Sequence, residues 1–235
     1  IPASDAERLN ALNELCTAYR PPLVRFAQSL GNSQEDAEDL TQGFLTQVIS
    51  RDLFGSTSPL KGRLRSFLLV AFKRFIANEW HKASAAKRNH GKKALSIDAA
   101  PEALDHAPEP SDDRSPDKVF EKEWALRLLQ RVKEALWTDY ENANKGHLVN
   151  ELSQFLLGDS RGTSYADVCK KLELPQGTVK SHVFRMRQRY KQLLREEISH
   201  TVNDPDEIDS ELQHLRQALS YPSKRSLGDE GTTNA

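Results

Sequence analysis

The sequence predicts an all-α protein in which two small helical domains are joined by a flexible acidic linker, the second domain containing a helix-turn-helix. Apolar residues recur at helical spacing through most of the chain. The charges are segregated: residues 61–93 carry ten lysines or arginines against one glutamate, and residues 98–117 carry seven acids against one arginine. With 37% hydrophobic and 29% charged residues, the chain has the composition of a soluble, helix-favouring protein. The net charge of −1 argues against indiscriminate coating of nucleic acid.

The N-terminal region predicts three helical pieces before residue 51. The first spans residues 9–19 and stops at Pro21-Pro22, because proline removes a backbone donor from a helix. A second piece then continues to Gly31. Ser33 and Asp36 form a capping-box-like start for the next helix, over residues 36–50.

The first turn of that third helix is unusually acidic. Its carboxylates are stabilised by the helix dipole, which is sufficient to explain them. They are Glu35, Asp36, Glu38 and Asp39. The dipole does not explain the further polar positions Gln42 and Gln47, interrupted by Leu40 and Phe44. This mixed face is therefore a candidate docking surface.

Residues 61–88 predict a long basic helix. Its core stripe consists of Leu64, Phe67, Leu68, Ala71, Phe75 and Ile76. Phe72 and Trp80 are interleaved among cations, the composition that stacks unpaired bases beside a phosphate-binding surface. A buried position is the competing interpretation for each aromatic residue of this helix.

The rest of the chain divides into a linker, a second helical domain and an extension. Residues 89–115 contain proline, glycine and acids with little periodicity, as expected of a linker. The second domain covers residues 116–200 and opens with a long helix that begins near Ser115, with Pro116 in its first turn. The extension, residues 201–235, predicts a short acidic helix followed by a disordered tail.

Residues 164–195 predict the helix-turn-helix. Ser164 occupies an N-cap position and Pro175 precedes the second helix, while Glu173 stands where a glycine is usual in the turn. The second helix carries the apolar stripe Val179, Val183, Met186, Tyr190, Leu193 and Leu194. Its other faces are polar and cationic, which suits the DNA major groove. A pair of amphipathic helices with a merely solvated basic face is the alternative.

The order of these parts resembles a bacterial extracytoplasmic-function sigma factor, the minimal two-domain specificity subunit of RNA polymerase. The resemblance covers residues 10–88 and 116–197. YRPPLVRFAQSLG and DAEDLTQGFL resemble the family's first conserved helices, and SYADVCKKLELPQGTVKSHVFRMRQRYKQLLR resembles its C-terminal helix-turn-helix. The match is looser in the basic helix, where Phe67-Leu68 stands in place of a tryptophan-leucine pair.

The resemblance implies three groups of functional residues. Contacts with the minus-thirty-five element would come from Gln176, Thr178, Lys180, Ser181, His182, Arg185, Arg187 and Arg189. Recognition and melting of the minus-ten element would involve Arg65, Lys73, Arg74, Asn78, Trp80, Lys82 and Arg88. Core polymerase would be bound by Glu38, Asp39, Leu40, Gln42 and Phe44. The implied partners are the clamp helices of the largest polymerase subunit, promoter DNA and, in some family members, an anti-sigma factor.

Two other classes of function compete with this interpretation. A stand-alone helix-turn-helix regulator would bind operators without polymerase. An enzyme could use the Glu35–Asp39 carboxylates with a histidine or a metal, but that helix contains no histidine, and neither a nucleophile elbow nor a phosphate-binding loop is present. We therefore expect a cytoplasmic protein that is not an enzyme, requires no cofactor or metal and is not inserted in a membrane. Cys16 and Cys169, on apolar helix faces, are expected to be reduced.

Overall fold

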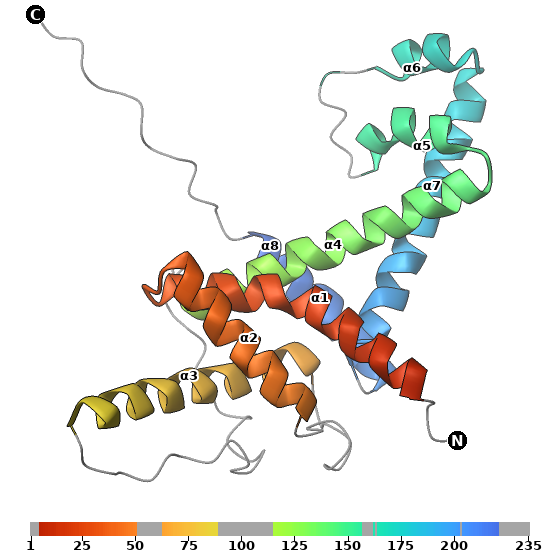
Figure 1. The fold of residues 1–235 in the computed structure, drawn as a ribbon. Coiled ribbons are helices and arrows are strands. Elements are labelled where there is room, and N and C mark those ends of the chain that lie inside the picture. Colours follow the sequence, from red (N-terminus) through yellow and green to blue (C-terminus); the bar gives the residue numbers. More distant parts are fainter. Residues whose placement is uncertain are drawn as a thin grey trace, which may run out of the picture.

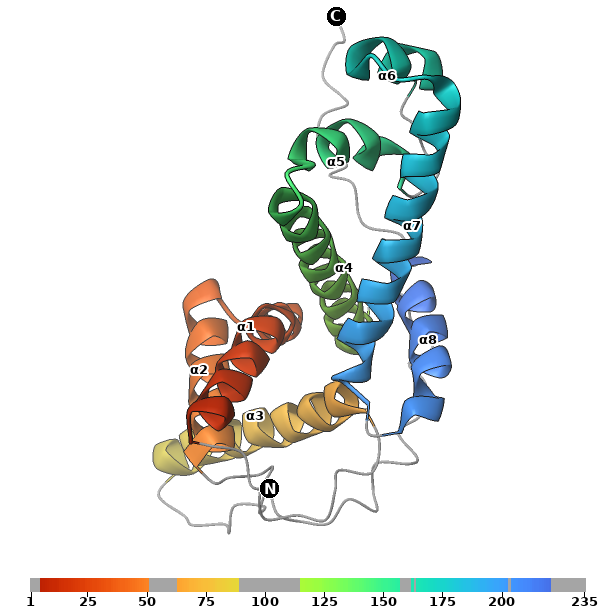
Figure 2. The ribbon, with the colours of Figure 1, turned by 90° about the vertical axis from the view of Figure 1, so that its right-hand side faces the viewer.

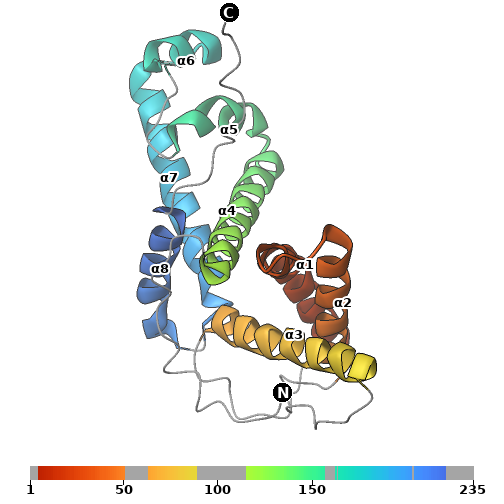
Figure 3. The ribbon, with the colours of Figure 1, turned by 90° about the vertical axis from the view of Figure 1, so that its left-hand side faces the viewer.

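A computed structural model describes residues 5–50, 63–88, 115–156, 162, 164–202 and 204–220, and the side chains of residues 5, 7–9 and 83–88 are not described. The fold is all-α, as predicted, and no strand occurs among the described residues. Helices α1, α2 and α3 form one group, and α4 to α8 form an elongated column beside it (Figures 1 and 2). The short helix α6 lies at the end of the column that is remote from α3 in all three ribbon views (Figure 3).

Helix α1 (Asp5–Ser29) is continuous through Pro21 and Pro22, so the predicted break at the two prolines is wrong. Each proline removes one hydrogen bond of the helix. Tyr19, Leu23 and Phe26 are buried on both sides of the prolines, and packing of this stripe offsets the lost bonds. The helix ends before Gly31, which has a φ of +94°.

Helices α2 (Gln34–Ser50) and α3 (Leu64–Arg88) pack through a cluster of phenylalanines. The Phe44 and Phe72 rings lie 5.0 Å apart between centroids, and Phe44 and Phe75 lie 5.8 Å apart. Phe26 of α1 joins the cluster at 6.0 Å from Phe72. Ser33 accepts a hydrogen bond from the Asp36 backbone N–H at 3.1 Å, which confirms the predicted start of α2.

The column begins with α4 (Pro116–Asn142), which confirms the predicted helix start near Ser115 with Pro116 in the first turn, and Ser115 is its N-cap. After the turn come α5 (Gly146–Leu152) and the short 3-10 helix η2 (Ser153–Phe155). A Cβ at Gly146 would meet the Glu141 carboxylate, and that side chain would have to shift to make room. Helices α6 (Tyr165–Leu172) and α7 (Gln176–Ser199) follow and form the helix-turn-helix.

The extension after α7 folds back on the column. The 3-10 helix η3 (Pro205–Glu207) leads into α8 (Ile208–Ser220), which packs against both α4 and α7. A short acidic helix in this region was predicted. The predicted disordered tail, from residue 221, lies outside the described residues.

The two helical groups are packed together. Helix α1 lies along α4, and the buried apolar residues of both groups form one continuous cluster. Tyr19 of α1 and Trp124 of α4 are among its members. This arrangement differs from the expectation that the two halves reorient freely, because helical periodicity identifies an apolar face without identifying its partner. Residues 89–114 of the predicted linker (residues 89–115) lie outside the described residues.

Candidate nucleic-acid interface

The start of the helix-turn-helix is fixed by a capping box. Ser164 Oγ accepts a hydrogen bond from the Asp167 backbone N–H at 3.2 Å, and the Ser164 N–H donates to Asp167 Oδ2 at 3.2 Å. Hydrogen bonds from the Ser164 hydroxyl and N–H lower the pKa of Asp167. The ring of Tyr165 stacks on Phe155 at 4.3 Å, so that α6 is also held against η2. These contacts give α6 a defined position against the preceding element.

We expect the change Ser164→Ala to lower the free energy of unfolding by about 1 kcal/mol, because the alanine leaves the first turn of α6 without its cap. Chemical denaturation followed by circular dichroism would measure the loss. Ser199→Ala is the matched control, since Ser199 Oγ only donates to the Glu196 carbonyl near the end of α7. Equal stability of the two variants would show that the cap contributes nothing.

The turn between the helices is tight despite the absence of glycine. Glu173 has the left-handed conformation, with φ 55° and ψ 36°, which costs a residue with a Cβ about 1 kcal/mol. The Leu174 N–H donates to the Cys169 carbonyl at 3.1 Å and closes the end of α6. Pro175 is the N-cap residue of α7, so the helix begins at Gln176 as the sequence indicates.

Helix α7 has a buried stripe and an exposed polar face, as predicted. Val179, Val183 and Met186 are buried, whereas Gln176, Lys180, Ser181, Arg185 and Gln188 are exposed. Thr178 and His182 are partly buried at the edges. The N-terminal part of α7 thus presents amide, hydroxyl and cationic groups to a ligand at the outer end of the column (Figure 1).

Sequence reasoning missed Phe184, whose side chain is 63% exposed. It is one helical turn from Lys180 and Ser181 and therefore lies on the same face. In a DNA major groove, an exposed aromatic ring beside hydrogen-bonding side chains can contact the methyl group of a thymine. The sequence could have identified Phe184, because this large apolar residue lies outside the apolar stripe of the helix and among polar residues.

The surroundings of His182 are electropositive. Partial burial and the nearby charges of Arg185, Lys145 and His147 lower the pKa of His182. Lys145 and His147 belong to the turn after α4 and the start of α5, so this cationic region extends beyond the helix-turn-helix. A region of like charge of this kind favours an anionic partner.

Two of the arginines predicted to bind DNA instead form hydrogen bonds or ion pairs within the protein. Arg187 donates to the Phe155 carbonyl from Nε at 2.9 Å and from Nη2 at 2.5 Å, and so fixes η2 against α7. Arg189 pairs with Asp139 of α4 at 2.6 Å and more weakly with Glu196. We therefore remove Arg187 from the candidate surface, whereas the Arg189 side chain is 38% exposed and stays at its edge. Their position on the flank of the buried stripe explains why they contact neighbouring elements.

The predicted minus-ten residues of α3 are not gathered on one exposed surface. Trp80 is 50% exposed and Lys82 is exposed beside Glu79, with which it pairs at 2.7 Å. Lys73 pairs with Asp117 at 2.6 Å, Asn78 is buried, Arg74 is partly buried and Arg88 has no described side chain. Phe72, interpreted as a base-stacking candidate, is fully buried and belongs to the core. Trp80 and Lys82 are thus the most accessible members of this group.

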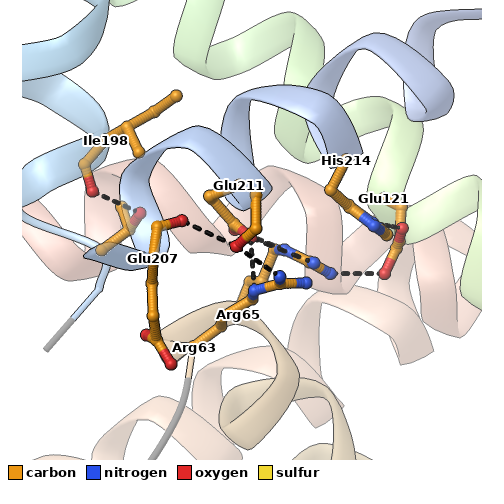
Figure 4. Close-up of polar contacts among 9 residues, drawn as sticks. Arg63, Arg65, Glu121, Ile198, Glu207, Glu211 and His214 are labelled. Atoms are coloured by element: carbon orange, nitrogen blue, oxygen red, sulfur yellow. Dashed lines mark hydrogen bonds and ion pairs between the residues drawn. The ribbon is translucent and has the colours of Figure 1, made fainter. Parts of the chain in front are cut away.

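Arg65 is the largest departure from the predicted site, because it is only 3% exposed (Figure 4). Its guanidinium pairs with Glu211 of α8 at 2.6 Å and with Glu121 of α4 at 2.5 Å. It also lies 5.1 Å from the centroid of the Trp124 ring, a cation–π contact. Arg65 is therefore unavailable to nucleic acid in this arrangement.

Glu121 is shared between two elements, since it also bonds His214 of α8 (Figure 4). Burial alone would raise the pKa of Glu121, but the hydrogen bond to His214 and the charge of Arg65 outweigh it, and the net pKa is lowered. A lowered carboxyl pKa stabilises the fold at pH values above the ordinary pKa of glutamate, which is about 4.3. That contribution is lost as the pH falls through the lowered folded-state pKa.

We therefore expect Glu121→Gln to be less stable than the unmodified chain at pH 7, with the difference shrinking as the pH drops below about 4. Urea denaturation at several pH values would measure it. Glu123→Gln is the control, because Glu123 pairs only with Arg127 within α4 at 3.2 Å. A stability difference for Glu121→Gln that is independent of pH would contradict the role of its charge.

The predicted partner surface on α2 includes both exposed and buried residues. Asp39 and Gln42 are exposed, and Glu38 pairs with Arg20 of α1 at 3.4 Å. Leu40 is partly buried against the core. Phe44 is 1% exposed, so it is a core residue and cannot contact a partner. The accessible part of this surface consists of Asp39 and Gln42, with Glu38 at its edge.

Within the described part of the chain, no group of three or more histidine, cysteine or carboxylate side chains is arranged to hold a metal ion. None of the described helices combines the length and the apolarity needed to cross a membrane. Cys16 and Cys169 are unpaired with each other and partly buried.

Comparison with curated proteins finds one distant similarity that spans most of the chain. Over 198 residues the chain is 24% identical to the ECF RNA polymerase sigma factor SigE of Mycolicibacterium smegmatis, which covers 84% of this chain and 67% of that protein. No family model matches the sequence. No solved structure matches it significantly. The similarity supports a sigma-factor-like role in transcription.

Proposed function

We propose that this protein is a cytoplasmic sigma factor of the extracytoplasmic-function type, which binds core RNA polymerase and directs initiation at promoters with defined minus-ten and minus-thirty-five elements. The observation that carries the proposal is the exposed face of α7, held by a capped α6 and a tight turn at one end of the molecule. The distant similarity to SigE adds independent support over most of the chain.

In this proposal α7 reads the minus-thirty-five element. Gln176, Lys180 and Ser181 lie near the start of the helix, where side chains usually reach base edges. Arg185 lies one turn further along, and Lys191 further still, where cations tend to meet phosphates. Phe184 adds an apolar group to this face for contact with a thymine methyl.

The region of residues 1–88 would bind polymerase and the minus-ten element. Asp39 and Gln42 provide the exposed part of the polymerase contact, and Trp80 provides an exposed aromatic side chain for an unpaired base.

We expect the double variant Asp39→Lys, Gln42→Ala to bind core polymerase about tenfold more weakly, which corresponds to about 1.4 kcal/mol. Both residues are exposed on α2, so the helical content should not change. Affinity capture with purified core polymerase would measure binding, and circular dichroism would measure folding. Thr46→Lys, at another exposed position of α2, is the control for an added positive charge. Binding of the double variant equal to that of the unmodified chain would contradict this surface.

A stand-alone regulator remains the competing function, and one assay separates the two. A sigma factor should shift promoter duplexes strongly only when core polymerase is present. A regulator should shift a specific duplex by itself. Electrophoretic mobility with and without core polymerase distinguishes them.

A further inference from the structure

The extension after the helix-turn-helix makes an unusual contact with the start of α3. Two guanidinium groups, that of Arg65 in α3 and that of Arg63 just before the helix, converge on the same carboxylate, that of Glu211 in α8 (Figure 4). Arg63 Nε lies 2.8 Å from Glu211 Oε2, and Arg65 donates to both carboxylate oxygens, at 2.6 and 3.3 Å. Glu211 is 0% exposed. The contact therefore joins residues that are almost 150 positions apart in the chain.

Further hydrogen bonds and ion pairs surround this contact between Glu211 and the two arginines. Arg63 donates to Ser210 Oγ at 3.0 Å, and the Leu64 N–H donates to the Thr201 carbonyl at 3.1 Å. On the other side of Arg65, Glu121 of α4 bonds both Arg65 and His214. Helix α8 thus joins the start of α3 to α4, with Glu211 at the centre.

Stability alone does not account for such a centre. A buried ion pair gains little net free energy, because desolvation of the charges offsets their attraction, and an apolar replacement is often as stable. A buried ion pair does make a contact specific, and it can be replaced by competing charges. Bidentate pairing with a carboxylate uses the same guanidinium geometry that binds a phosphate. Glu211 consequently occupies the groups with which Arg63 and Arg65 could bind nucleic acid.

We propose that α8 is an intramolecular latch, in which Glu211 masks Arg63 and Arg65 and holds α3 against the column until the two arginines are released to nucleic-acid phosphates. This inference rests on the proposed function for its physiological partner, promoter DNA. It gives the C-terminal extension a role that is separate from the helix-turn-helix.

The test compares Glu211→Gln with Asp209→Asn in the full chain. Both variants remove one negative charge from α8. Asp209 is the matched control because its exposed carboxylate pairs with Arg195 of α7 at 2.6 Å and not with α3. Amide hydrogen exchange would report opening of α8, and fluorescence anisotropy would report binding of a single-stranded 20-nucleotide DNA of mixed sequence.

We expect Glu211→Gln to accelerate exchange in α8 and to bind the DNA about tenfold more tightly, as a population shift from a latched state requires. Because two arginines are released, the slope of log affinity against log salt should steepen by about 1.4. Adding Arg63→Gln and Arg65→Gln to Glu211→Gln should abolish the gain. Asp209→Asn should gain little, since only net charge changes.

Equal gains for Glu211→Gln and Asp209→Asn would overturn the latch, because they would reflect net charge alone. Faster exchange in α8 without tighter DNA binding would overturn the masking role. If Glu211→Gln does not fold, Glu211→Asp keeps the charge but shortens the reach and should show part of both effects. Transcription by core polymerase is measured separately with the unmodified chain, so a failed latch and a failed sigma function are distinguishable.

Discussion

Replacing Phe44 with alanine should lower the free energy of unfolding by about 3–5 kcal/mol, the range for removing a buried phenylalanine. The Phe44 ring contacts Phe72 and Phe75 and therefore joins α2 to α3 at the centre of the first helical group. The cavity left by alanine would lie among aromatic rings that cannot easily move to fill it. Chemical denaturation would measure the loss.

Ile49→Ala is the matched control in the same helix, because Ile49 is 42% exposed and its truncation should cost only about 1 kcal/mol. If Phe44→Ala is as stable as Ile49→Ala but loses polymerase binding, Phe44 is a partner contact and its assignment to the core is wrong.

Replacing Lys180 with alanine should weaken binding to the minus-thirty-five element by roughly 5- to 150-fold, or about 1–3 kcal/mol. This loss should arise from contacts with a single base pair of the element. Lys180 is exposed near the start of α7 and lies on the face that carries Ser181 and Phe184. Its loss should relax the preference at the base pair it reads, while the minus-ten preference stays unchanged. Binding should be measured on the holoenzyme with single-base variants of the element.

Lys191→Ala is the control, because Lys191 is an exposed cation further along α7. It should weaken all promoter variants alike and lower the slope of log affinity against log salt by roughly one unit. A uniform loss across all variants for Lys180→Ala would reassign Lys180 to the phosphates.

The sequence predicted the elements whose signals are local. The N-cap at Ser164, the helix start near Ser115 and Pro116 and the turn before Pro175 depend on residues within a few positions of one another. The buried stripe of α7 follows from helical periodicity in the same way. The prolines of α1 misled because burial of Tyr19 and Phe26 on either side outweighs the two lost hydrogen bonds.

The site was less predictable, because exposure depends on contacts between distant segments. Arginine is a residue type that commonly binds DNA, but each of Arg65, Arg187 and Arg189 is bonded to another element of the fold. Phe44 and Phe72 are hidden by packing of helices that no local pattern pairs. The contact between Arg65 and Glu211 joins residues 146 positions apart, so only the folded arrangement reveals it.

We propose that this chain gives promoter specificity to RNA polymerase, and run-off transcription measures that specificity. Core polymerase would be supplied with fragmented host DNA, with and without the full chain. We expect discrete transcripts that require the chain and that share upstream sequences at the minus-ten and minus-thirty-five positions. Identical transcript patterns with and without the chain, obtained with folded protein, would contradict it.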